Sequence, residues 1–123
     1  MTDHRDALTV VNTYLSSLVS SDHQAIVSLY AHDTSVEDPV GSDILRGPEA
    51  IKNFYHHATA AVKRAELLGD IRVAGNEVAF PFEITADLGA GIMKIQVIDV
   101  FHFNADGKVA STRAFWSQNN MKM

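Results

Sequence analysis

The stretch Ile92–Phe103, IMKIQVIDVFHF, decides the fold, because it is the longest run of the chain that reads as a β-strand. Successive side chains of a strand point to opposite faces of a sheet, so the run divides into two sets. One face carries Met93, Ile95, Val97, Asp99, Phe101 and Phe103, and the other carries Ile92, Lys94, Gln96, Ile98, Val100 and His102. The first face is the more apolar, and we expect it to be covered by the rest of the protein.

The sequence on either side of this run also predicts strands. Val78, Phe80, Phe82 and Ile84 alternate with smaller or polar residues, and Pro81 among them indicates an edge or a bulge. The turn NADG, residues 104–107, joins the long strand to a final strand, Val109–Ser117, as a hairpin.

The first half of the chain predicts helices. Apolar residues recur every three or four positions from Asp6 to Val19. Ser20 to Asp22 supply caps for a second helix that runs to about Ala31, and Gly47-Pro48 opens a third that runs to about Val62. Three tyrosines fall on the inward faces of these helices: Tyr14, Tyr30 and Tyr55. Helices followed by strands predict an α+β fold, a curved antiparallel sheet with three N-terminal helices on its concave side.

Composition narrows the class of protein. A chain of 123 residues is long enough for one domain, residues 1–123, with one core, and it has no cysteine for a disulfide or a thiolate metal site. A net charge of -5 without a basic cluster argues against nucleic acid. The sequence has no signal peptide and no apolar run of membrane-spanning length, so we expect a cytoplasmic protein.

Asp99 is the one acid on the apolar face of the long strand. An isolated carboxylate there is costly to desolvate, so it must pair with a cation, accept several hydrogen bonds or stay protonated. No Arg or Lys shares its face. A protonated Asp99 would donate a hydrogen bond and could stabilise a developing negative oxygen. A purely structural role, with the carboxyl bonded to backbone or to a tyrosine, remains open.

A second pair of acids, Glu37 and Asp38, lies in VEDPVG, residues 36–41. Pro39 pushes the backbone of Asp38 toward an extended conformation, which fixes the direction of its side chain. That suits a side chain with a positional task, although acids before a proline also simply begin turns. Glu37 is expected to point away from Asp38.

These residues resemble those of the ketosteroid isomerase family over most of the chain. The matching segments are Tyr14, LYAHDTSVEDPVGS from Leu29 to Ser42, IKNFY ending at Tyr55, VIDVFHF around Asp99, and AFWS with Trp116. The resemblance implies a cone-shaped fold of the nuclear-transport-factor-2-like, or SnoaL-like, class, assembled as a homodimer through its sheet.

The resemblance also implies roles for single residues. Asp38 would be the general base, Tyr14 and Asp99 would donate hydrogen bonds to the substrate oxygen, and Tyr55 and Tyr30 would extend that network. The reaction implied is conversion of a 3-oxo-Δ5-steroid to its conjugated Δ4 isomer through a dienolate, with no cofactor.

The pocket wall is less determined by the sequence. Its candidates are Val40, Phe54, Phe82, Phe101, Phe115 and Trp116, although aromatic residues at such spacings often belong to a plain core. The histidines form no metal pattern, because adjacent His56 and His57 diverge by about 100° around a helix.

Two other kinds of function remain open at this point, since one fold hosts many activities. One is a different enzyme of the fold, such as a polyketide cyclase or a dehydratase, which needs an acid but not both oxygen donors. The other is a non-catalytic carrier of steroids, in which Asp38 only shapes a turn.

Overall fold

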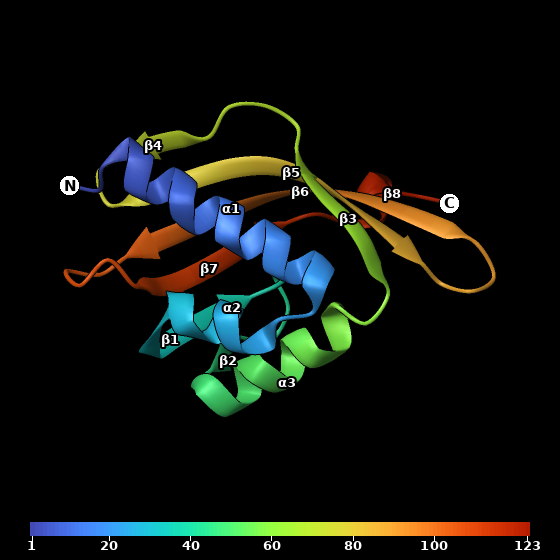
Figure 1. The fold of residues 1–123 in the computed structure, drawn as a ribbon, viewed down its shortest axis with the longest axis horizontal. Helices are drawn as coiled ribbons and strands as arrows, with labels where there is room; N and C mark the ends of the chain where they lie inside the picture. The colour runs from blue at the N-terminus through green and yellow to red at the C-terminus, as the bar shows by residue number, and fades with distance from the viewer.

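The computed structural model describes residues 1–123 as three α-helices and one eight-stranded sheet, which confirms the α+β class (Figure 1). The elements follow in the order α1 (His4–Ser20), α2 (His23–Leu29), β1 (Tyr30–Glu37), β2 (Leu45–Arg46), α3 (Pro48–Ala58), β3 (Val62–Leu67), β4 (Arg72–Ala74), β5 (Glu77–Asp87), β6 (Ile92–Phe103), β7 (Val109–Phe115), the 3₁₀ turn η1 (Gln118–Asn120) and β8 (Met121–Lys122).

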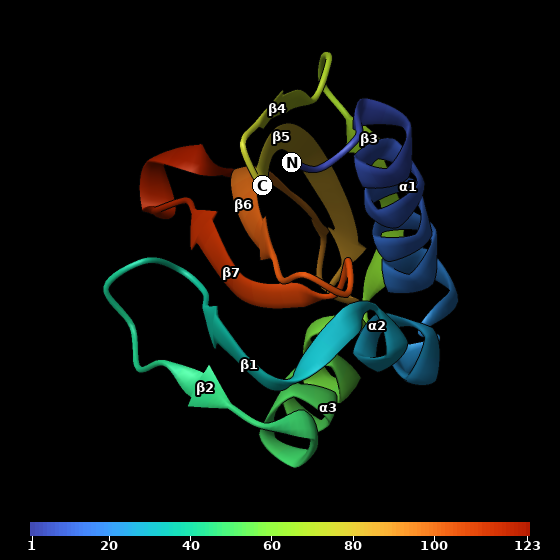
Figure 2. The ribbon, with the colours of Figure 1, turned by 90° about the vertical axis from the view of Figure 1, so that its left-hand side faces the viewer.

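The sheet is curved and mixed. Its strand order is β2-β1-β7-β6-β5-β3, with β4 also paired to β5 and β8 to β6. All pairs are antiparallel except β1 and β7, which run parallel. The prediction of an antiparallel sheet is therefore wrong for this one pair of strands. Figure 2 shows α1 and α3 on the side toward which the sheet curves.

Strand β6 has the two faces that its sequence predicts. Val97, Asp99, Phe101 and Phe103 are buried, whereas the alternate positions from Ile92 to His102 are exposed or half-buried. Its turn to β7 is closed by the Gly107 N–H, which donates to the Asn104 carbonyl at 3.0 Å, and Gly107 has a positive φ of 76°.

Pro81 lies inside β5, where the strand changes partner. On one side β5 pairs continuously with β6. On the other side the pairing with β4 reaches Ala79, and β3 ends, at Leu67, opposite Phe82. The Pro81 carbonyl accepts from the Leu68 N–H at 2.9 Å, on the side of β3. The missing N–H of the proline therefore faces the gap between β3 and β4, where it costs no ladder bond.

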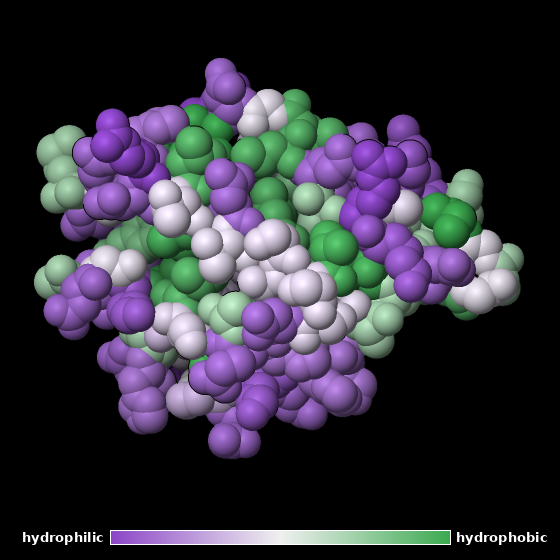
Figure 3. Space-filling view, in the orientation of Figure 1, coloured by the Kyte–Doolittle hydropathy of each residue, from purple (hydrophilic) through white to green (hydrophobic).

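Helix α1 is longer than expected and lies across the sheet. Its N-cap is Asp3, whose side chain accepts from the backbone N–H groups of Arg5 and Asp6. Its buried stripe includes Val11, Tyr14 and Leu18. Figure 3 shows hydrophobic residues beside α1 and β3, and mostly hydrophilic residues over α2 and α3.

The second helix is shorter than its prediction. It begins after the N-cap Asp22 and ends at Leu29, and Tyr30 and Ala31 already belong to β1. Tyr30 is inward as expected, but from a strand. Helix α3 likewise ends at Ala58, and Val62 belongs to β3.

The core lies between the helices and the sheet. Twenty buried hydrophobic residues form one cluster, at whose centre Tyr14 packs edge-on against the rings of Phe80, Phe82 and Phe101. None of the helices combines the length and hydropathy needed to cross a bilayer.

Candidate active site

One cavity of about 390 Å³ is lined by Tyr14 from α1, Asp38 from the turn that follows β1, and Asp99 from β6. These residues are far apart in the sequence, and the packing of α1 on the curved sheet brings them together. The cavity is mainly apolar, because 14 of its 17 lining residues are hydrophobic. Its size and lining are those of a site for a small apolar ligand with few polar groups.

Asp99 is held rigidly in the middle of the sheet. It lies opposite Phe80 of β5 on one side and Ala114 of β7 on the other. Only 1% of its surface is exposed, and its Oδ1 is buried without a hydrogen-bond partner. Burial, and then the negative charge of Asp38, raise the pKa of Asp99 well above its usual value. A neutral Asp99 can donate a hydrogen bond to a ligand.

The segment that carries Asp38 is fixed by its neighbours. Glu37 accepts from the Arg113 Nε at 3.2 Å and from the Gly41 N–H at 3.0 Å, so it points away from Asp38 as expected. The Val40 N–H donates to the Ala114 carbonyl at 2.8 Å, which ties the turn to β7. The Asp38–Pro39 peptide bond is cis.

The two oxygens of the Asp38 carboxylate have different surroundings. Oδ1 accepts from the Trp116 Nε1 at 2.7 Å, whereas Oδ2 has no hydrogen bond within the protein. Burial raises the pKa of Asp38, and the bond from Trp116 opposes this increase. Oδ2 is therefore the oxygen available to exchange a proton with a ligand in the cavity.

Three tyrosines form a chain of hydrogen bonds behind the cavity. The hydroxyls of Tyr30 and Tyr55 are 2.6 Å apart, and those of Tyr55 and Tyr14 are 3.2 Å apart. Burial is the largest cause of a raised pKa in each of the three, so all remain neutral donors. If Tyr30 donates to Tyr55 and Tyr55 to Tyr14, the proton of Tyr14 is free for a ligand oxygen.

The structure divides the expected pocket wall into two groups. Phe54, Phe82 and Trp116 line the cavity, whereas Val40, Phe101 and Phe115 do not. Phe101 is fully buried against Tyr14 and Tyr30, in the core behind the cavity. Phe115 is 42% exposed, on the outer face of the sheet opposite Ile98.

Other parts of the lining were not predicted from the sequence. These residues come from the end of α3, the turn after it, strands β3, β5 and β6, and the turn between β5 and β6: His57, Ala58, Ala60, Ala61, Val62, Ile84, Ala86, Leu88, Met93, Ile95 and Val97. Met93, Ile95 and Val97 share the face of Asp99, so strand alternation was a usable signal for those three.

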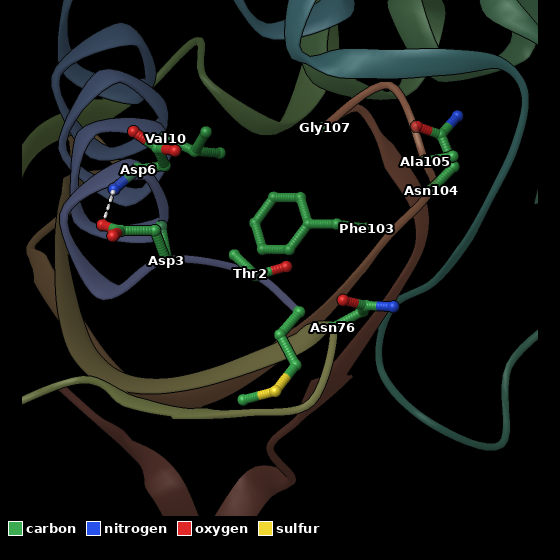
Figure 4. A pocket seen from close by; sticks show the side chains of 11 residues that line it. Thr2, Asp3, Asp6, Val10, Asn76, Phe103, Asn104, Ala105 and Gly107 are labelled. Atoms are coloured by element: carbon green, nitrogen blue, oxygen red, sulfur yellow. Dashed lines mark hydrogen bonds between the residues drawn. The ribbon is translucent and has the colours of Figure 1, made fainter.

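A second hollow, of about 410 Å³, lies at the N-terminus beside the β6–β7 turn (Figure 4). Its acids are Asp3 and Asp6, both exposed, and Asp3 is occupied in capping α1. It contains neither a tyrosine nor a buried acid. No group of three or more His, Asp or Glu side chains is placed to hold a metal ion anywhere in the chain. The cavity of Tyr14, Asp38 and Asp99 is therefore the candidate active site.

Comparison with known proteins identifies the family and the fold of the chain. A family model described as a SnoaL-like domain matches residues 11–112. A steroid Δ-isomerase of Nocardioides simplex is 42% identical over 111 residues, which cover 90% of this chain and 89% of that protein. The structure of SalBIII, an epoxide hydrolase/cyclase-like enzyme of pyran ring formation in salinomycin, superposes with a TM-score of 0.90 at 27% identity, covering 100% of this chain and 99% of that one. The chain has the SnoaL-like fold and belongs to the ketosteroid isomerase family.

Proposed function

We propose that the protein is a steroid Δ-isomerase, which converts 3-oxo-Δ5-steroids to conjugated 3-oxo-Δ4-steroids. One observation carries this proposal: Asp99 and Tyr14, both buried, line the same apolar cavity as the half-buried carboxylate of Asp38. Burial raises the pKa of Asp99, which favours its protonated, hydrogen-bond-donating form. This is the arrangement established for ketosteroid isomerases, so it supports the family's reaction rather than a new one. The similarity to the Nocardioides simplex enzyme supports the same substrate class.

The first step is removal of a proton from C4, the carbon between the ketone and the alkene. The Oδ2 of Asp38 takes the proton as the C4–H bond breaks, a C3–C4 double bond forms, and the electrons of the carbonyl bond move to its oxygen. Trp116 holds the other oxygen of the carboxylate at 2.7 Å, which keeps the base oriented and favours its ionised form. General-base catalysis of this kind contributes about 10² to 10⁴ in rate.

The dienolate that results carries its negative charge on the former ketone oxygen. Tyr14 and Asp99 are the two neutral donors that would bind it, and Tyr55 and Tyr30 polarise Tyr14 through their own hydroxyls. Each donor of this type contributes about 10² to 10³ in rate. The apolar lining strengthens both bonds, because it lowers the local dielectric constant.

In the second step the proton moves from Asp38 to C6. The C4–C5 double bond forms, the C5–C6 double bond is lost, and the C3 carbonyl is restored. Asp38 returns to its carboxylate state, so the cycle needs no cofactor and no external acid.

The test is turnover of 5-androstene-3,17-dione, followed by the ultraviolet absorbance of the conjugated enone. The wild type is expected to produce this absorbance rapidly, and Asp38→Asn, which removes the base, should lose at least about 10² in rate. Asp33→Asn is the matched control, because Asp33 is an exposed acid of β1, the strand that precedes Asp38. No enone from a folded wild-type protein, or equal rates in Asp38→Asn and the wild type, would refute the proposal.

A cyclase or a dehydratase remains the second candidate, because the SalBIII fold superposes over the whole chain. Such an enzyme would require Asp38 but need not use both Tyr14 and Asp99. Turnover of an epoxide or a hydroxyketone, with no enone formed from 5-androstene-3,17-dione, would therefore favour this second candidate.

A homodimer is proposed as the assembly. The outer face of the sheet exposes Ile98 at 49% and Phe115 at 42%, opposite one another in register, with Val100 beside them half-buried. Adjacent apolar side chains on a sheet face are typical of an interface. Sedimentation equilibrium should give twice the chain mass, and Ile98→Lys should shift the protein toward monomer; a wild-type monomer at micromolar concentration would contradict the proposal.

A further inference from the structure

The cavity contains one polar side chain to which the proposed reaction gives no role. Of its 17 lining residues, the three that are not hydrophobic are Asp38, Asp99 and His57. His57 comes from the last turn of α3 and is exposed, whereas Asp99 and Tyr14 are buried. His57 therefore lies at the mouth of the cavity, and the groups that bind the reacting oxygen lie at its floor.

The hydrogen bond of His57 within the helix determines what the ring can offer to a ligand. Its Nδ1 is 2.9 Å from the backbone carbonyl oxygen of Asn53. A carbonyl oxygen only accepts, so Nδ1 carries the proton of this bond. In the neutral ring, Nε2 is then a hydrogen-bond acceptor, and it has no partner in the protein.

The shape of the proposed substrate connects the floor to the mouth. Four fused rings form a rigid body, so a steroid whose C3 oxygen reaches Tyr14 and Asp99 must direct its opposite end, at C17, toward the opening. The walls between are aliphatic and aromatic, and His57 is the one lining residue there with an unused acceptor.

We propose that His57 is a specificity-determining residue, which accepts a hydrogen bond from a hydroxyl group at the end of the steroid remote from the reacting ketone. The inference rests on the proposed function and adds a preference within its substrate class. A ketone at C17 only accepts hydrogen bonds, so it cannot satisfy the neutral His57 ring, whereas a 17β-hydroxyl group can. A site that offers an acceptor discriminates in favour of the ligand that carries the matching donor.

The experiment compares two substrates that differ only at this end, 17β-hydroxy-5-androsten-3-one and 5-androstene-3,17-dione. The wild type should favour the hydroxyl substrate in kcat/KM by about threefold to tenfold, the range of one hydrogen bond. His57→Ala should reduce the ratio to about one, and His57→Gln, which keeps an acceptor, should restore part of it. His32→Ala is the matched control, because His32 is an exposed histidine of β1 that does not line the cavity.

The design separates failure of the inference from failure of the proposed function. Turnover of both substrates, with a ratio near one in the wild type or a ratio unchanged by His57→Ala, overturns the inference alone. An equal change of the ratio in His32→Ala also overturns it, because the effect would then not come from the cavity. Absence of turnover with both substrates removes the proposed function and this inference together.

Discussion

Replacing Asp99 is the perturbation that best separates a neutral hydrogen-bond donor from a structural acid. The carboxyl group is 1% exposed, its Oδ1 has no partner in the protein, and burial raises its pKa well above the usual value. A side chain in this state has a proton to donate into the cavity. Asp99→Asn keeps the shape and an N–H donor, whereas Asp99→Ala removes the donor and leaves Tyr14 alone on the oxygen.

The expected magnitudes follow from this geometry. Loss of one of two oxyanion donors lowers kcat by about 10² to 10³, or about 2.7 to 4 kcal/mol of transition-state stabilisation. Asp99→Ala should lose that amount. Asp99→Asn exchanges an acidic O–H donor for a weaker amide donor, and we expect it to lose about tenfold. The two variants should therefore differ by at least about tenfold in kcat.

The assay is enone formation from 5-androstene-3,17-dione at saturating substrate, with thermal unfolding of each variant as the check on folding. Equal, large losses in both variants would refute the reasoning, because an amide would then be no substitute for the acid. Rates near wild type in folded Asp99→Ala would refute it as well, since the reaction would not need the donor.

Three further outcomes test the surroundings of the two acids. Trp116→Phe removes the hydrogen-bond donor that lowers the pKa of Asp38, so the acidic limb of the kcat/KM pH profile should move to higher pH. A limb at the same pH as in the wild type would contradict the role of that hydrogen bond. The pKa of Asp99 is higher in the folded chain than in the unfolded chain, so between these two pKa values the folded chain binds more protons. The free energy of unfolding should therefore fall as pH rises through this window, by up to about 1.4 kcal/mol for each pH unit. Urea titrations of Asp99→Asn should lack this contribution, and identical slopes in wild type and variant would count against it. Tyr55→Phe removes both hydroxyl contacts of the tyrosine chain and should lower kcat by about twofold to tenfold; a loss as large as that of Tyr14→Phe would place Tyr55 on the substrate itself.

The features set by local alternation could be predicted from the sequence. In β6 every second residue is buried from Val97 to Phe103, so the buried position of Asp99 followed from the pattern around it. The same alternation rule, applied to β7, also gives the orientation of Phe115 and Trp116. Thr112 and Ala114 are buried, so Phe115 must face outward and Trp116 inward.

The features set by contacts between distant segments could not be predicted in this way. Strand β1 follows α2 without a turn. Tyr30 is four residues from Ile26, so the helical spacing of inward residues continues to Tyr30 although the helix itself ends at Leu29. The parallel pairing of β1 with β7 joins Glu37 to Arg113, and nothing local in either segment indicates it. Ala60 and Ala61, in the turn after α3, line the cavity, and the strand that follows them, β3, packs against α1.

The central claim is that one carboxylate, Asp38, removes the C4 proton and returns it to C6 within a largely apolar cavity. The most direct test is conversion of unlabelled 5-androstene-3,17-dione in deuterium oxide, with the isotope at C6 of the product read by mass spectrometry and NMR. If a single shielded base transfers the proton, a large share of the first product formed by the wild type should carry protium at C6. Asp38→Asn should lose both this transfer and most of the rate. Product whose new C6 hydrogen is entirely deuterium, formed at an equal rate by Asp38→Asn, would show that solvent or another group moves the proton and would contradict the account.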